Sequence, residues 1–349
     1  MAAAALFVSC ENTMDFKLEG AEERLVMNAQ MYTADTVHYV MLCVSGNDRV
    51  RRIRDGVVTC FVNGEKVATA TEPVEIKGFE DRNVHYYYLE GKTPGETRQT
   101  CYAIKARFSP GDKVRLEVSV DGGEFSASSE VTVPEPPVFR IADTTLTDGY
   151  STGTVGIENL LKVRIKGQDK KGEKTYYRLG EVSDYREDHY YYGWGDNTQI
   201  QRATNTLKPD PLDDHILLDG SQNSDFPIGG GSEGNDFLVF SDNFFADGEY
   251  DFTFSVPGRD FHPYYGSSAK QYFMSCDLSV RMYVIPEIEY RYLKAACSVL
   301  YNDGDFTISE PVSLPSNVEG GLGIVSVSSE ANDTIRFTYG TEFEIKEED

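Results

Sequence analysis

Oxygen ligands are concentrated between residues 210 and 219 of the chain. Asp210, Asp213, Asp214 and Asp219 lie there, and His215 stands among them. Calcium prefers carboxylate oxygens of this kind, although the spacing does not follow the EF-hand loop and no glycine occupies its turn position. These aspartates are therefore candidate calcium ligands, and no other cofactor is expected. The alternative is a solvated acidic loop that binds no ion.

A second candidate site is an aromatic segment a short way upstream. Tyr190, Tyr191, Tyr192 and Trp194 follow His189, and Trp194 is the only tryptophan of the chain. Exposed aromatic rings stack on sugars and peptides and dominate the energy of many binding surfaces. We therefore expect a peptide or a glycan to bind here. The alternative is that Tyr190 and Tyr192 form the buried face of a strand.

Motifs of hydrolytic enzymes occur in the chain, but their surroundings do not fit. Residues 149–153 and 230–234 match G-x-S-x-G, a pattern that needs a hydrophobic strand before the serine and a helix after it. Neither segment has these flanks. Asp143–Thr145 resembles one half of an aspartic protease site, and no second half exists in the sequence. We predict no catalytic residue, with a pair of carboxylates for glycoside cleavage as the alternative.

The N-terminal residues resemble a targeting signal. Residues 1–9 are mostly apolar and end in a small residue directly before Cys10, and polar residues follow. This pattern is typical of the end of a lipoprotein signal peptide, although the positive residues that open such peptides are missing. We expect residues 1–21 to be a truncated signal peptide, lipobox and tether, with acyl chains on Cys10. The alternative is a frayed N-terminus with a chance cysteine.

The charge of the chain limits its partners. Fifty-seven acidic and 33 basic residues give a formal net charge of -24. Such a charge repels phosphate backbones and anionic lipid headgroups at ordinary salt. We therefore expect no nucleic-acid partner, and membrane contact only through the lipid anchor.

Strands must position these candidate residues. The 22 Tyr, 19 Phe and 31 Gly suit pleated, half-buried surfaces joined by tight turns. Residues 114–120 alternate strictly between apolar and polar, and Asn63–Gly64 and Asp121–Gly123 favour hairpin turns. Short strands at regular spacing predict an immunoglobulin-like β-sandwich over residues 22–135. The expected strands are 25–32, 37–45, 57–62, 66–71, 84–89, 100–108, 114–120 and 124–133.

A proline-rich segment separates this part from the rest. Residues 134–137 read Pro-Glu-Pro-Pro, which cannot continue a central strand, so we place a domain boundary there. Residues 138–349 are expected to form a β-rich domain with one packed α-helix near 286–301, started by Pro286. The polar stretch 185–234 is expected to be a long connection and the place of ligand binding. The expected strands are 161–165, 250–256, 277–284 and a final pair, 324–328 and 334–339.

Several segments together resemble one known family. They are Leu25–Ala29, Phe240–Asp242, Phe245–Tyr250, Glu289–Lys294 and Asn317–Gly323. With Cys10 and the acidic stretch after it, they are similar to the lipoprotein family of Bacteroidota catalogued as domain of unknown function 4249 (DUF4249). The resemblance covers nearly the whole chain from Cys10, and its most specific parts are the helix and the Asn-x-x-Gly-Gly-x-Gly segment.

The resemblance implies a lipid-anchored protein of the cell outer membrane, often encoded beside a TonB-dependent transporter and without an established activity. We therefore expect an outward-facing, non-catalytic lipoprotein that captures a ligand as the accessory partner of a TonB-dependent outer-membrane receptor. Two alternatives remain. One is a secreted glycan hydrolase, and the other is a structural or adhesive surface protein that uses its sandwich as a spacer.

Overall fold

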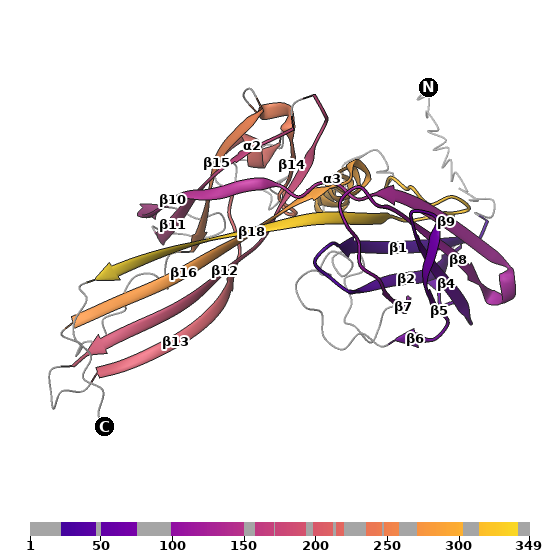
Figure 1. Cartoon of the computed structure of the whole chain (residues 1–349), viewed down its shortest axis with the longest axis horizontal. Helices are drawn as coiled ribbons and strands as arrows, with labels where there is room; N and C mark the ends of the chain where they lie inside the picture. Colours follow the sequence, from indigo (N-terminus) through magenta and orange to yellow (C-terminus); the bar gives the residue numbers. More distant parts are fainter. Residues whose placement is uncertain are drawn as a thin grey trace, which may run out of the picture.

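The computed structural model shows a chain built mainly of β-strands, as the sequence predicts. It describes residues 22–46, 50–74, 99–149, 158–170, 172–192, 198–211, 214–219, 235–245, 248–257, 271–302 and 314–340. Figure 1 shows two bodies, one formed by the strands that open the chain and one by the later strands. The long strand β18 (Val325–Gly340) passes from one body to the other.

The strands of the first body follow the alternation of apolar side chains. In β8, Val114, Leu116, Val118 and Val120 are buried, whereas the residues between them are partly or fully exposed. One face of the strand therefore packs inward and the other meets water. The elements are β1 (Arg24–Tyr32), β2 (Val37–Ser45), β3 (Val50–Arg51), β4 (Gly56–Val62), β5 (Glu65–Ala70), β6 (Pro73–Val74), β7 (Thr100–Lys105), β8 (Lys113–Val120), the 3-10 helix η2 (Asp121–Gly123) and β9 (Phe125–Thr132).

The hairpin of β4 and β5 turns at Asn63–Gly64, as predicted. Asn63 has a φ of 52° and Gly64 a φ of 84°, positive values that a type I′ turn requires. The side chain of Asn63 donates to Asp112 Oδ1 at 2.8 Å and accepts from the Lys113 amide at 3.0 Å. These bonds tie the turn to the beginning of β8.

The strands of the first body form two sheets that share one core. One sheet has the order β5-β4-β8-β9, and the other contains the run β1-β2-β7-β6. Leu42 and Val44 of β2 and Leu116 and Val118 of β8 belong to the same buried cluster, so the body is a β-sandwich. The immunoglobulin-like detail is not confirmed, because β1 also pairs in parallel with β18 from the far end of the chain.

The second body contains the predicted helix. α3 (Glu287–Asn302) begins directly after Pro286, and its residues Leu293 and Ala296 are fully buried. Among the described residues, no helix has the length and apolar character needed to cross a bilayer. The other elements of this body are β10 (Val138–Gly149), β11 (Glu158–Gln168), β12 (Tyr176–Tyr191), β13 (Thr198–Leu207), α2 (His215–Leu218), β14 (Val239–Ser241), the 3-10 helix η3 (Asp242–Phe244), β15 (Glu249–Pro257) and β16 (Gln271–Ile285). The short strand β17 (Gly321–Leu322) pairs with β1 of the first body.

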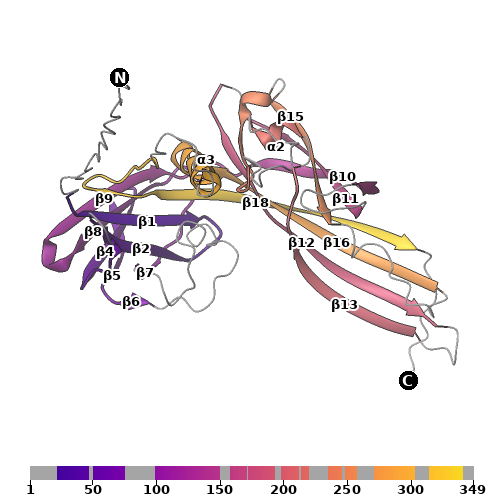
Figure 2. The same ribbon diagram turned by 180° about the vertical axis from the view of Figure 1, so that it is seen from behind.

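One large sheet runs through both bodies. Its order is β13-β12-β16-β18-β1-β2-β7-β6. β18 therefore pairs with β16 of the second body and with β1 of the first, and it joins the two bodies (Figure 2). Residues 134–137 connect β9 to β10, and the sequence predicts a domain boundary there. The large sheet nevertheless contains strands from both sides of this boundary. The predicted pair 324–328 and 334–339 is wrong, since one strand covers both. The polar residues between them stay in register with β16, and Arg281 Nε donates to Asn332 Oδ1 at 3.0 Å.

The predicted long connection over 185–234 is also wrong in its first half. β12 and β13 form a hairpin there, paired without a register shift from Val182–Leu207 to Tyr191–Thr198. The stretch has polar residues on its inward face, which hides the strand pattern. Asp184 and Asp188 are buried, and Asp184 Oδ1 accepts from the Asn205 amide at 3.1 Å.

A buried ion pair holds α3 to the large sheet. Arg178 of β12 is 4% exposed and Glu289 of α3 is 0% exposed, with 3.7 Å between their closest charged atoms. Arg178 also donates to Tyr32 Oη at 3.1 Å, and Ser328 Oγ donates to Glu289 Oε2 at 2.6 Å. Arg178 lies 4.4 Å from the ring centroid of Tyr283. The pair joins residues of β1, β12, β18 and α3 at the place where the two bodies meet.

Candidate functional site

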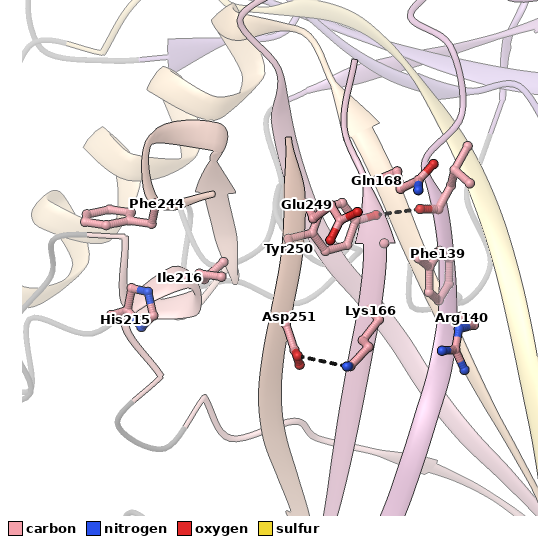
Figure 3. A pocket seen from close by; sticks show the side chains of 12 residues that line it. Phe139, Arg140, Lys166, Gln168, His215, Ile216, Phe244, Glu249, Tyr250 and Asp251 are labelled. Carbon is pink, nitrogen blue, oxygen red and sulfur yellow. Dashed lines mark hydrogen bonds and ion pairs between the residues drawn. The ribbon is translucent and has the colours of Figure 1, made fainter. Parts of the chain in front are cut away.

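A groove of about 580 Å³ lies on the second body (Figure 3). Its floor is formed by neighbouring segments of β10, β11 and β15, which make up the three-stranded sheet β10-β11-β15. Its other wall comes from α2 and η3. A volume of this size accommodates a small ligand. The lining residues are Val138, Phe139, Arg140, Lys166, Gly167, Gln168, His215, Ile216, Phe244, Glu249, Tyr250 and Asp251.

The floor of the groove depends on a glycine. A Cβ atom on Gly167 would lie 2.2 Å from Cζ of Tyr250, so the Tyr250 ring occupies the space that a side chain would fill. Tyr250 Oη donates to the Val138 carbonyl at 3.1 Å. The ring therefore lies across β11 and fixes β10 to β15. Glycine permits this close approach because it has no side chain.

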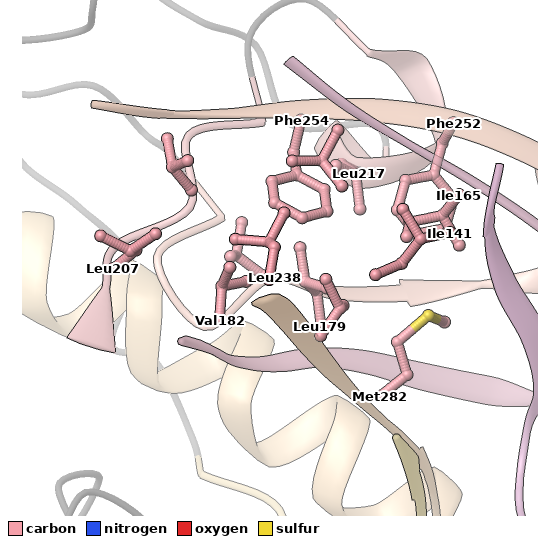
Figure 4. Close-up of a cluster of buried hydrophobic side chains, with 14 of the residues drawn as sticks. Ile141, Ile165, Leu179, Val182, Leu207, Leu217, Leu238, Phe252, Phe254 and Met282 are labelled. Carbon is pink, nitrogen blue, oxygen red and sulfur yellow. The ribbon is translucent and has the colours of Figure 1, made fainter. Parts of the chain in front are cut away.

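A hydrophobic core supports the sheet from behind. Figure 4 shows Phe252, Phe254 and Ile165 of this sheet facing Leu179 and Met282 of the large sheet. All of these side chains are buried in one cluster. Because protein interiors are close-packed, the position of the groove strands is set by this core.

The charged groups of the groove fall into two kinds. Lys166 Nζ lies 3.3 Å from Asp251 Oδ2, and Arg164 donates two hydrogen bonds to Asp251 at 2.7 and 2.6 Å. The hydrogen bonds from Arg164 lower the pKa of the Asp251 carboxyl below its usual value. By contrast, Arg140 and Glu249 have no ion pair or side-chain hydrogen bond with any residue that the structure describes.

The wall beside β15 is held by two of the predicted aspartates. Asp214 caps α2 by accepting from the Ile216 amide at 3.0 Å, and its other oxygen accepts from the Thr253 amide at 2.9 Å. Asp210 pairs with Ser255 through two backbone hydrogen bonds of 2.7 and 2.8 Å. Asp210 and Asp214 therefore lie along the edge of β15. His215 and Phe244 follow on this wall with 5.9 Å between their ring centroids.

The remaining aspartates of the proposed calcium site lie elsewhere or outside the described residues. Asp219 accepts from the Ser241 amide and hydroxyl at 3.2 and 3.1 Å and from the Tyr290 hydroxyl. Lys294 Nζ lies 3.5 Å from its carboxylate. Asp213 is not among the described residues. Within the described ranges, no group of three side chains could hold a metal ion, and calcium stays a prediction.

The predicted aromatic residues lie at the far end of the large sheet. Tyr190, Tyr191 and Tyr192 are all half-buried, and Trp194 is outside the described residues. The Tyr190 ring lies 5.2 Å from that of Tyr272 and 6.4 Å from that of Tyr192. Tyr190 packs against the core of the second body, so part of this cluster is structural. Its role in ligand binding stays a prediction.

A cluster of buried polar side chains lies beside these aromatic residues on β12. Asp188 is 3% exposed, and its carboxylate accepts from Tyr272 Oη at 2.6 Å and pairs with Arg186 at 2.8 Å. Burial, followed by the hydrogen bond to Asp188, raises the pKa of Tyr272. Because these charges are paired and hydrogen-bonded, their burial is tolerated. The hydrogen bond between Tyr272 and Asp188 joins β12 to β16.

The cysteines and the serine motifs add no reactive group to the described part. Cys60, Cys101 and Cys276 are free thiols, and burial raises the pKa of Cys60 to about 11 and that of Cys101 to about 12. Thiols with such values stay protonated near neutral pH and are poor nucleophiles. Cys10 lies outside the described residues, as do both serines of the G-x-S-x-G matches, Ser151 and Ser232.

The groove supplies charged, polar and apolar groups that can contact a ligand. Glu249 and Asp251 are its two carboxylates, and glycoside cleavage would need one of them as a general acid with a raised pKa. The pKa of Asp251 is instead lowered by Arg164. An arginine, a glutamate, an amide and exposed apolar side chains are the groups that a ligand would meet.

Sequence reasoning did not find the groove. Its residues come from β10, β11 and β15, which are separated by long stretches of chain, and no spacing rule connects Arg140 with Glu249. One signal was present. Gly167 interrupts the alternation of an otherwise clear strand, and such a glycine marks a close approach of another group.

A comparison with protein families gives one match. The family described as Domain of unknown function (DUF4249) matches residues 11–334. A search of curated proteins found no match to the chain.

Proposed function

This chain belongs to the DUF4249 family, and we propose that it is a lipid-anchored binding protein on the outer face of a bacterial outer membrane. In this proposal it captures a small ligand and passes it to a TonB-dependent receptor without catalysing a reaction. The family resemblance of the sequence supports the address, and the groove on the second body supports the binding. Nucleic acids are not partners, because the net charge of -24 repels them.

The observation that carries the binding role is the pair of uncommitted charges in the groove. Arg140 and Glu249 line a cavity beside exposed apolar side chains and make no ion pair with the described residues. Asp251, which also lines the groove, is instead neutralised by its ion pairs with Arg164 and Lys166. Charges in a groove that lack internal partners are available to a ligand.

Attachment through Cys10 explains how such a protein stays at the membrane. Cys10 follows a short apolar run that ends in a small residue, which is typical of a lipobox. Acyl chains on this cysteine would insert into the membrane, while the acidic body stays in water. The tether of residues 11–21 would separate the first body from the bilayer surface.

The test is purification of the tagged, full-length chain from its native outer membranes. We expect a TonB-dependent receptor to co-purify and mass spectrometry to find acyl chains on Cys10. The matched control is Cys10→Ser, which should be recovered in soluble fractions without the receptor. A wild-type chain that is unacylated and cytoplasmic would contradict the proposal, and so would a pure chain that cleaves glycans.

A further inference from the structure

We infer that the groove binds a short zwitterionic peptide, with its carboxylate on Arg140 and its ammonium group on Glu249. This inference rests on the proposed role of the groove as a ligand site and adds the chemical class of the ligand. The sequence alone leaves peptide and glycan as equal alternatives. The arrangement of charges on the three strands of the floor distinguishes them.

The two free charges have opposite signs and lie on opposite sides of the floor. Arg140 is on β10 and Glu249 is on β15, with β11 between them (Figure 3). The central pair, Lys166 with Asp251, is internally neutralised at 3.3 Å. A ligand therefore meets a cation at one side, a neutral centre and an anion at the other side.

The spacing of the two charges fits the length of a small peptide. The register pairs Arg140 with Lys166 and Gln168 with Glu249, so the two charged residues are two strands apart and offset by two positions along the strands. Neighbouring strands are separated by roughly 4.8 Å and successive residues by roughly 3.3 Å, which places the Cα atoms of Arg140 and Glu249 about 12 Å apart. An extended peptide spans about 3.3–3.6 Å per residue, so about three residues connect the two sides.

Other lining groups suit a peptide bound between these ends. Gln168 lies in the row between Val138 and Glu249, and it offers an amide donor and acceptor to a peptide backbone. Val138 is 66% exposed and Phe244 is 41% exposed. Both can cover an apolar side chain of the ligand. A neutral oligosaccharide would use the aromatic ring but would leave both charges without a partner.

The experiment is calorimetric titration of the full chain with the tripeptide Ala-Phe-Ala. Three comparison ligands are its N-acetylated form, its C-terminal amide and maltotriose. Each modification removes a hydrogen bond between charged groups, so each should weaken binding by about tenfold or more. Maltotriose should bind more weakly than the unmodified tripeptide.

Two variants assign each end of the ligand. Arg140→Gln should weaken binding of the tripeptide about tenfold and abolish the difference between the free acid and the amide. Glu249→Gln should do the same for the difference between the free amine and the acetylated form. Lys162→Gln is the matched control, because Lys162 is exposed on β11 and does not line the groove. Its affinities should equal those of the wild type.

The outcomes separate this inference from the proposed function. Equal binding of the tripeptide and both modified forms would overturn the peptide assignment, as would no binding of the tripeptide at millimolar concentration. Tight binding of maltotriose that Phe244→Ala weakens and Arg140→Gln does not would also overturn it, while the groove would remain a ligand site. Loss of receptor co-purification bears on the proposed function alone.

Discussion

The two bodies of the chain treat their charged side chains differently. In the first sandwich, the buried Asp121 accepts from Arg51 at 2.6 Å and from the Arg54 amide at 2.7 Å, so its charge is satisfied internally. In the second body, Arg140 and Glu249 line a groove without such partners among the described residues. Both bodies have a close-packed apolar core. In the proposed function, the first body is therefore the scaffold and the second body is the one that contacts a ligand.

The junction between the bodies should give the largest effect on stability. Arg178→Met leaves the buried Glu289 carboxylate without its cation, which costs about 3–5 kcal/mol of unfolding free energy. Urea denaturation measures this loss. The double variant Arg178→Met/Glu289→Met should recover most of it, because no charge is then left buried.

A surface pair of the first body is the control for the junction. Arg54 and Glu124 are 3.1 Å apart and their side chains are 69% and 55% exposed. Glu124→Gln should cost no more than about 1 kcal/mol, because water screens exposed pairs. A junction variant as mild as this one would mean that the two bodies are not joined through Arg178.

The next prediction compares how a buried carboxylate of the first body and an exposed carboxylate of the second contribute to stability as pH changes. Burial raises the pKa of Asp121, but the hydrogen bonds from Arg51 and Arg54 outweigh it, so the pKa is lowered overall from 3.8. The carboxylate therefore stabilises the fold above about pH 3.8, and this contribution is lost as pH falls through the lowered pKa. Asp121→Asn should cost about 1.5–3 kcal/mol at neutral pH and flatten the acid limb of the stability curve.

Asp251 in the groove is the exposed carboxylate with which the acid-dependent contribution of Asp121 is compared. Its pKa is also lowered, first by the hydrogen bond from Arg164, so its contribution has the same sign and is lost in the same direction of pH. The side chains of Asp251 and Arg164 are 42% and 49% exposed, so water screens their interaction. Asp251→Asn should therefore cost about 0.5 kcal/mol or less of unfolding free energy. Thermal unfolding between pH 3 and pH 7 would show both curves. A larger effect at Asp251 than at Asp121 would reverse the comparison.

A glycine variant in each body separates an effect on stability from an effect on binding. Gly167→Ala forces the Tyr250 ring out of its place, at a cost of about 1–3 kcal/mol, and should abolish binding of Ala-Phe-Ala. Gly64→Ala strains a positive φ in the first body at a cost of roughly 1–2 kcal/mol. That variant should keep full affinity. Equal loss of binding in both would indicate general unfolding.

Local patterns in the sequence predicted the elements that obey simple periodicity. β8 alternates between apolar and polar side chains, and β2 and β4 are rich in β-branched and aromatic residues. α3 follows Pro286 with apolar residues at helical spacing. The turn at Asn63–Gly64 has the residues that its positive φ values require. In these segments the local preference and the final packing agree, so the sequence alone is sufficient.

The segments that were missed have polar residues inside the fold. Asp184 and Asp188 of β12 are buried, and they accept hydrogen bonds from the Asn205 amide of β13 and from Tyr272 of β16. Their polarity indicates a loop when the sequence is read alone. In β18, Asn332 and Asp333 resemble a turn but are held by Arg281 and by the Ile141 amide. Such bonds connect residues far apart in the chain, and no local rule contains them.

In the candidate sites too, local chemistry could be predicted from the sequence and long-range contacts could not. The aspartates between 210 and 219 were recognised by their chemistry, but the bond that Asp214 accepts from the Thr253 amide comes from β15, which follows much later in the chain. Arg140 and Glu249 have unremarkable neighbours in the sequence. Their opposition across β11 comes from strand register alone.

Hydrogen exchange measured by mass spectrometry, with and without Ala-Phe-Ala, tests the central claim most directly. The claim is that ligand contact is confined to the groove of the second body. We expect slower exchange in β10, β11, β15 and α2, and unchanged exchange in β1 to β9. Protection of the first sandwich, or of the segment around Tyr190–Tyr192 with the groove unchanged, would contradict it.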